Sequence, residues 1–144
     1  MSINFLCPDH RNWVYFHPQE ALSYLDDAQG VGEKLLREKD WQEATAYLGC
    51  AFETTEILME LQGATKSFLL GRLTVLASML ANAFYHQKAY QYQEQIITQA
   101  KANLHTAAQA SLGNKPRLAY IQECIASLKA DLVVRPSAEG VTLH

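Results

Sequence analysis

Residues 37–58, REKDWQEATAYLGCAFETTEIL, contain the pattern that decides the fold of this chain. Asp40, with Glu43 three residues later, forms the acidic pair that caps the start of a helix. After Trp41, small and apolar residues recur at the three-and-four spacing of one helix face: Ala44, Leu48, Ala51, Phe52, Thr55 and Leu58. Small residues on a buried face let a second helix approach closely. The stretch therefore predicts a helix packed tightly against a neighbour.

The same spacing extends over most of the chain on both sides of this stretch. It predicts five helices with short connections, over residues 18–39, 41–62, 65–86, 89–110 and 116–133. The helix over 65–86 is apolar around most of its circumference, so we expect it at the centre of the fold. Short connections force neighbouring helices antiparallel. The predicted fold is all-α, a five-helix stack of antiparallel helical hairpins.

The two ends of the chain lack this spacing. Residues 1–17 contain the boundary signals Cys7-Pro8 and His17-Pro18, and we expect this segment to be non-helical. Residues 135–144 have no period, and we expect a disordered tail there. The helical domain is therefore expected to cover residues 18–134.

An internal repeat relates two parts of the predicted helical domain. Residues 31–51 align without a gap on residues 80–100, at a period of 49 residues. Aromatic, large and small residues fall at equivalent positions: Trp41 with Tyr90, Leu35 with Phe84, Leu48 with Ile97, and Ala51 with Ala100. Each unit is thus a helix, a tight polar turn, and a second helix that opens on an aromatic residue.

This pattern resembles the tetratricopeptide repeat over about residues 20–112. Its order of small, large and aromatic positions is matched by two sets of residues: Gly32, Leu35, Trp41, Ala44, Leu48 and Ala51, and then Ala81, Phe84, Tyr90, Ile97 and Ala100. Three features depart from the family pattern. Gln93 stands where a small residue is expected, no proline closes either unit, and the period exceeds the usual length of about 34 residues. The helix over 116–133 would be the capping helix that such a stack requires.

The resemblance implies a non-catalytic interaction module, such as a scaffold, an adaptor or a small bacterial chaperone like those of type III secretion. In such stacks the first helix of each hairpin lines a concave groove that binds a peptide or helix. The positions implied here are Asp26, Gln29, Glu33, Leu36, Arg37, Val75, Ser78, Asn82, Tyr85 and His86. The partner is expected to be a protein or peptide whose identity the sequence does not give, or a second copy of the chain.

A different class of function is offered by Cys7, His10 and His17, whose side chains are zinc-ligand types. The alternative is a metal-binding or thiol enzyme centred on this segment. Cys50 and Cys124 fall on inward or flanking helix faces and are expected to be inert packing. A helix face also carries acidic residues, which we expect to be solvated: Glu53, Glu56 and Glu60.

Length, composition and charge limit the number of domains and the kinds of partner that we expect. A chain of 144 residues suggests one domain that can bury a core without disulfides. Residues 1–63 hold 11 acidic and 4 basic residues, whereas residues 64–144 hold 4 acidic and 8 basic ones. That asymmetry suits head-to-tail association, so a structural homo-oligomer subunit is a further alternative. Dense basic segments and long apolar runs are lacking, so we expect no binding to nucleic acid or membrane. The three cysteines are widely spaced and no secretory signal is recognised, so we expect free thiols and a cytoplasmic protein. We also expect no cofactor.

Overall fold

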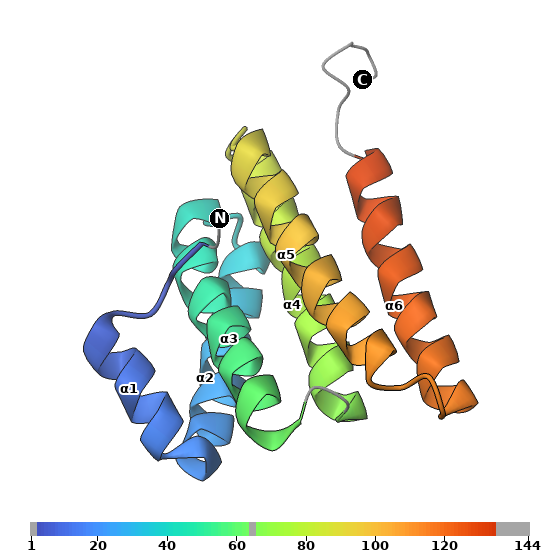
Figure 1. The fold of residues 1–144 in the computed structure, drawn as a ribbon. Helices are drawn as coiled ribbons and strands as arrows, with labels where there is room; N and C mark the ends of the chain where they lie inside the picture. Colours follow the sequence, from blue (N-terminus) through green and yellow to red (C-terminus); the bar gives the residue numbers. More distant parts are fainter. Residues whose placement is uncertain (1–2, 64–65, 135–144) are drawn as a thin grey trace.

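The structure is a computed structural model that describes residues 3–63 and 66–134, with side chains described as far as residue 129. In these ranges the chain is all-α, as expected, and contains no strand. The helices are α1 (Pro8–Phe16), α2 (Pro18–Arg37), α3 (Trp41–Gln62), α4 (Ser67–His86), α5 (Tyr90–Gln109) and α6 (Lys115–Val134). Each of the helices α2 to α5 packs on the next in chain order, and α6 also packs on α4. In Figure 1, α3 and α5 lie in front of α2 and α4.

The expectation that residues 1–17 are non-helical is wrong for residues 8–16, and the described chain has six helices rather than five. Both X-Pro pairs mark boundaries: Pro18 opens α2 as predicted, and Pro8 opens α1, which was not predicted, as the fixed φ and missing N–H of proline allow. Cys7 is extended (φ −69°, ψ 160°), and its sulfur accepts a hydrogen bond from the His10 backbone N–H at 3.4 Å. His17 separates α1 from α2. The expected tail of residues 135–144 lies outside the described residues.

The stretch from which the fold was predicted forms α3, with boundaries close to the expected ones. The Asp40 side chain accepts a hydrogen bond from the Glu43 backbone N–H at 3.4 Å, so the predicted cap is confirmed. At the other end, Gly63 has φ 105° and ψ 130°, a positive φ that favours glycine. Ala44 and Ala51 are both fully buried. A Cβ atom added to Gly32 on α2 would lie 2.5 Å from the Leu48 side chain, which shows how closely α2 and α3 approach.

The internal repeat is also visible in the backbone of the two hairpin turns. Lys39 (φ 61°) and Lys88 (φ 60°) are the positive-φ non-glycine residues among those described, and they occupy equivalent positions of the two repeat units. In the first turn Asp40 N–H donates to the carbonyl of Leu35, and in the second Ala89 N–H donates to that of Phe84, both at 2.9 Å. This bond pattern satisfies the last carbonyls of a helix. The two turns therefore have the same geometry as well as related sequences.

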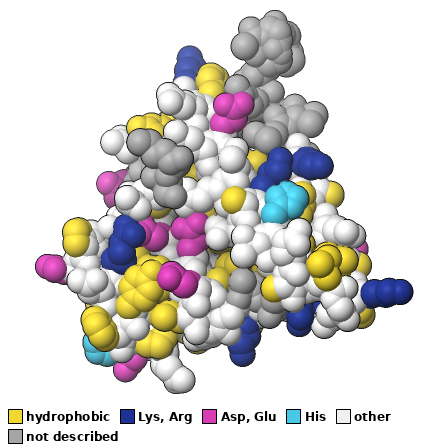
Figure 2. All heavy atoms as spheres, in the orientation of Figure 1, with side chains coloured by type: hydrophobic (Ala, Val, Ile, Leu, Met, Phe, Trp, Pro, Cys, Tyr) yellow, Lys and Arg dark blue, Asp and Glu magenta, His cyan; other side chains and the backbone are white. Residues whose placement is uncertain are grey.

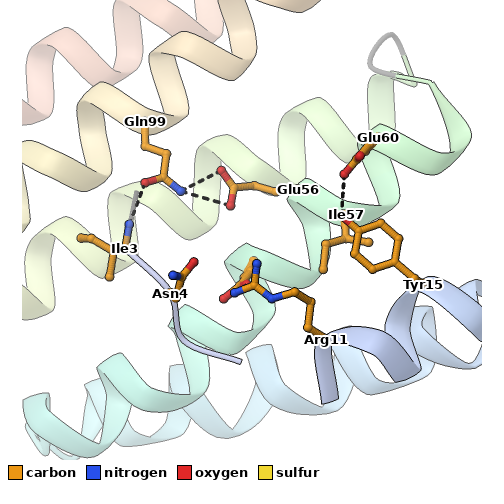
Figure 3. Close-up of a pocket in the computed structure, with 9 residues that line it drawn as sticks. Ile3, Asn4, Arg11, Tyr15, Glu56, Ile57, Glu60 and Gln99 are labelled. Carbon is orange, nitrogen blue, oxygen red and sulfur yellow. Dashed lines mark hydrogen bonds and ion pairs between the residues drawn. The ribbon is translucent and has the colours of Figure 1, made fainter. Parts of the chain in front are cut away.

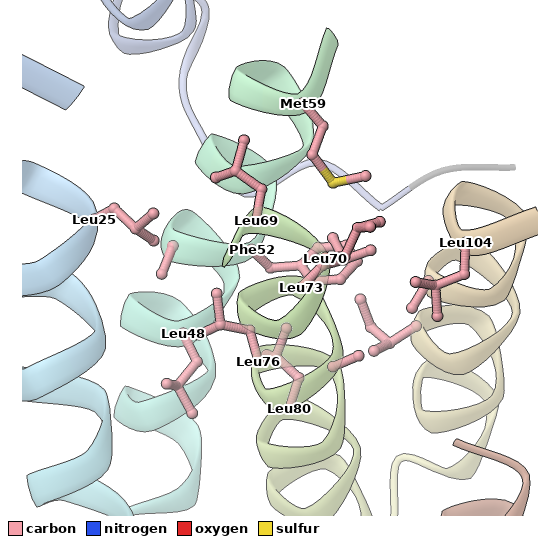
Figure 4. Packing of buried hydrophobic residues seen from close by; sticks show 14 of the residues in the cluster. Leu25, Leu48, Phe52, Met59, Leu69, Leu70, Leu73, Leu76, Leu80 and Leu104 are labelled. Atoms are coloured by element: carbon pink, nitrogen blue, oxygen red, sulfur yellow. The ribbon is translucent and has the colours of Figure 1, made fainter. Parts of the chain in front are cut away.

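Helix α4 forms the centre of the core, as its apolar circumference predicted. Its fully buried side chains meet those of α3 and α5 (Figure 4), and they include Leu69, Leu70, Leu73, Leu76, Ala77 and Leu80. Among the described helices, α4 alone is long and apolar enough to cross a membrane by length and composition. More than half of its most apolar window is buried inside the protein, as in a central core helix.

Candidate binding site

The positions implied by the tetratricopeptide resemblance lie on α2 and α4, where one basic residue organises three of them. Arg72 on α4 pairs with the Asp26 carboxylate through its Nη2 at 2.6 Å and donates from Nε to the Gln29 side chain at 2.6 Å. Gln29 in turn donates to the Glu33 carboxylate at 2.9 Å. These side chains thus form a polar network that bridges the two helices. Arg72 is the only Lys, Arg, Asp or Glu residue of α4, which is the sequence signal that could have identified it.

Beside this network, α4 presents apolar side chains to solvent. Val75 is 49% exposed, and Phe68, seven positions earlier and therefore on the same helix face, is 54% exposed. Between them, Gly71 approaches α6 closely, because a Cβ atom there would overlap the Tyr120 hydroxyl. The face of α4 with Phe68 and Val75 therefore runs between α2 on one side and α6 on the other. Of the other positions on α4, Asn82 is exposed and Ser78 is partly buried.

The remaining predicted positions gather near the tips of the hairpins. His86 stacks on Trp41 at the start of α3, with ring centroids 4.0 Å apart and planes at 10°. Tyr85 lies 6.1 Å from the Tyr90 ring. Leu36 is partly buried against the core, and Arg37 is exposed. The structure therefore divides the ten positions between an α2–α4 surface and an aromatic cluster at the tips.

The metal alternative is not supported, because Cys7 and His17 are separated by the length of a helix. Cys7 and His17 lie at opposite ends of α1, which spans roughly 13 Å at 1.5 Å per residue. The His10 ring packs against Tyr24, with centroids 4.4 Å apart. Within the described part of the chain, no group of three or more His, Cys, Asp or Glu residues is placed to hold a metal ion. Burial raises the pKa of the Cys50 thiol, which disfavours its thiolate form and agrees with the expected packing role of this residue.

The expectation that the acidic face of α3 is solvated is wrong for two of its three residues. Glu53 is only 4% exposed. Its Oε1 accepts hydrogen bonds from the backbone N–H groups of Phe5 (2.7 Å) and Leu6 (2.9 Å). Its Oε2 has Arg11 Nη2 as partner at 2.5 Å, in an ion pair rather than a well-aligned hydrogen bond. Periodicity did not reveal this because the covering residues come from the remote N-terminal segment.

Glu56 is the second covered carboxylate, and α5 covers it. Its two oxygens accept hydrogen bonds from Gln99 Nε2 at 3.1 and 2.9 Å, and Asn103 Nδ2 donates to one of them at 2.8 Å. Burial raises the pKa of the Glu56 carboxyl, and these two amides partly oppose the increase. Glu60, one turn further on, is exposed and accepts a hydrogen bond from the Tyr15 hydroxyl at 2.7 Å. That bond is the main cause of the raised pKa of Tyr15.

These groups surround a polar pocket of about 180 Å³ on the face that carries α1, α3 and α5. Figure 2 shows acidic side chains gathered beside a hollow on this face, and Figure 3 shows side chains from three elements directed toward the pocket. Its lining residues are Ile3, Asn4, Arg11, Tyr15, Glu53, Glu56, Ile57, Glu60 and Gln99. A second hollow of about 340 Å³ shares Glu56 and Glu60 and continues toward Asn103 and Thr106.

The raised pKa of Glu56 predicts how the free energy of unfolding changes with pH. A raised folded-state pKa means that the folded protein holds this proton more tightly than the unfolded chain does. The resulting stabilisation is present below the ordinary pKa of 4.5 and is lost as pH rises through the folded-state value. We expect the free energy of unfolding of wild type, minus that of Glu56→Gln, to decrease between about pH 4 and pH 7. Urea unfolding at several pH values measures this difference, and a constant or increasing difference would contradict the prediction.

Comparisons with known proteins do not add to this picture: no protein-family model, curated protein or solved structure matches the chain significantly.

Proposed function

We propose that the chain is a non-catalytic protein-binding module that holds a peptide or helix of a protein partner on the surface formed by α2 and α4. The observation that carries this proposal is the exposure of Phe68 and Val75 on one face of the central helix. Exposed apolar side chains that share a face, with polar groups at their edge, are typical of interaction sites. The Asp26–Arg72–Gln29 network supplies such an edge.

We infer that α2–α3 and α4–α5 are successive hairpins of a tetratricopeptide-like stack and that α6 is its capping helix. The matching turn geometry at Lys39 and Lys88 supports this arrangement. The contacts of α6 with both α4 and α5 support its capping role. A scaffold or a small cytoplasmic chaperone is the kind of protein that would use such a surface. Apolar side chains of the partner would contact the Phe68–Val75 face, and its polar groups would meet the Arg72 network.

The test is native mass spectrometry of the full chain, purified gently from its own source, as wild type and as Val75→Glu. We expect wild type to retain a peptide, a protein or a second copy at fixed stoichiometry. The substitution places a charge at the centre of the apolar face, so at least about 2 kcal/mol of binding free energy, more than tenfold in affinity, should be lost.

Tyr47→Glu is the matched control, since Tyr47 is similarly exposed (41%) but lies on α3. It should leave the retained partner in place. If both substitutions release the partner equally, or if wild type retains nothing under any gentle condition, the α2–α4 surface is not the binding site.

A further inference from the structure

We propose that the face of α3 and α5 beneath residues 3–6 is a second binding site, specific for a short non-helical peptide segment, and that the chain fills it with its own N-terminal arm. The arm is defined as residues 3–6. The peptide that this site fits carries an aromatic residue followed directly by an aliphatic one, as Phe5 and Leu6 do. This surface is separate from the α2–α4 surface, so the two proposals can fail independently.

The first argument is the way in which Glu53 holds the arm. One oxygen of this buried carboxylate accepts hydrogen bonds from two consecutive backbone N–H groups, those of Phe5 and Leu6. Two consecutive N–H groups reach one oxygen because the chain bends at Leu6. These contacts are to main-chain groups, so they do not depend on the side chains of the bound segment. Gln99 on α5 adds a third such contact, because its Oε1 accepts a hydrogen bond from the Ile3 N–H at 3.2 Å.

The second argument is the selectivity of the surface for an aromatic residue. Phe5 lies directly on the backbone of Gly49, where an added Cβ atom would overlap the ring. Only glycine leaves room for an aromatic ring at this depth. The next residue, Leu6, is 5% exposed and belongs to the core cluster. The thiol of Cys50, the residue after Gly49, lies 3.8 Å from the Phe5 carbonyl oxygen. The surface thus selects a ring and then an aliphatic side chain.

The third argument is that the arm is held mainly by side-chain groups of the helices, as a bound peptide ligand would be. Among the described residues, no backbone–backbone hydrogen bond joins residues 3–6 to the helices. The arm is held by hydrogen bonds to side-chain groups of α3 and α5, by packing of the Phe5 ring on Gly49, and by burial of Leu6. It also leaves the polar pocket beside Asn4 unfilled (Figure 3), so a competing peptide with a larger side chain there gains contacts that the arm lacks.

The experiment uses a fluorescent peptide with the sequence of residues 1–8, with serine in place of Cys7. It is titrated into the full-length wild type and into the full-length double variant Phe5→Ala/Leu6→Ala, whose arm has lost both side-chain anchors. The arm of the wild type competes for the site, so the apparent affinity for the peptide is reduced to the intrinsic affinity multiplied by the fraction of time that the site is free. We expect the double variant to bind the peptide at least about tenfold more tightly than wild type does.

Two controls separate this site from non-specific adhesion. A peptide in which alanine replaces phenylalanine should bind neither protein. Adding Gly49→Ala to the double variant should abolish binding, because the new Cβ atom would overlap the position of the phenylalanine ring of the peptide. Alanine is a better helix former than glycine, so this triple variant should be at least as stable as its parent. Absence of binding to the double variant, or binding that survives Gly49→Ala, would overturn the proposal.

A second measurement applies if the double variant does not fold. Excess unlabelled peptide added to wild type should accelerate amide hydrogen exchange at Phe5 and Leu6, because displacement of the arm removes Glu53 from these N–H groups. Unchanged exchange at peptide concentrations in the millimolar range would also overturn the proposal. A concentration-dependent dimer that is lost in Phe5→Ala would make a second copy the occupant, and would refute a separate peptide ligand.

Discussion

Replacing Glu53 by glutamine is expected to lower the free energy of unfolding by about 2–4 kcal/mol, as for a broken, mostly buried ion pair. The glutamine oxygen can still accept from Phe5 and Leu6, but its NH₂ group would face the Arg11 guanidinium, and two donors cannot pair. The Glu53 side chain is 6% exposed, so little water can replace the lost partner, whereas Arg11 at 36% can be partly rehydrated. Urea unfolding followed by circular dichroism measures the loss.

Glu60→Gln is the matched control on the same helix, two turns further along. Glu60 is exposed and accepts a hydrogen bond from the Tyr15 hydroxyl, so this variant should lose no more than about 1 kcal/mol. Equal effects of the two substitutions would show that the buried ion pair of Glu53 contributes no more to the free energy of unfolding than the exposed hydrogen bond of Glu60 does. Because Glu53 also holds the arm, Glu53→Gln should additionally accelerate amide exchange at Phe5 and Leu6.

The second large effect is expected for Leu73→Ala in the core. Leu73 is fully buried on α4, the helix that packs on α3, α5 and α6 (Figure 4). Truncation removes the transfer free energy of the lost carbons and leaves a cavity that three rigid neighbours cannot close. We expect a loss of about 2–5 kcal/mol in the free energy of unfolding, again measured in urea.

Val75→Ala, two residues along the same helix, is the control for this truncation. Val75 is half exposed, so the same kind of change should cost less than about 0.5 kcal/mol. A Leu73 variant as stable as the Val75 variant would contradict the central position of α4. The pair therefore tests which face of α4 is buried without reference to any partner.

Local sequence signals were sufficient to predict the helices of the central domain. Asp40 and Glu43 positioned the start of α3, and Gly63 marked its end. The small residues Ala44 and Ala51 indicated a closely packed helix, and both are buried. Such signals act within a turn or two of helix, so they can be recognised in one sequence without knowledge of the rest of the fold.

The same signals were misread where only context distinguishes two outcomes. His17-Pro18 was correctly expected to precede a helix that begins at Pro18, but Cys7-Pro8 was interpreted as a boundary inside a non-helical segment, although Pro8 is equally suited to the first turn of a helix. Nothing within residues 1–17 shows that α1 gains stability by burying Val14 against the other helices. A helix this short is marginal by itself, so its formation depended on tertiary packing.

The sequence by itself determined which segments between residues 18 and 134 become helices, how the start of α3 is capped, and that one hairpin turn recurs along the chain, because these features depend on neighbours in the sequence. The tertiary structure alone decided that the arm returns over α3 and α5, that Glu53 is buried, and that Arg72 joins α2 to α4. A helical period shows which face a residue occupies, but a carboxylate on an outward face is solvated or buried according to what lies above it. Above Glu53 lie Phe5, Leu6 and Arg11, which belong to a segment remote from it in the chain.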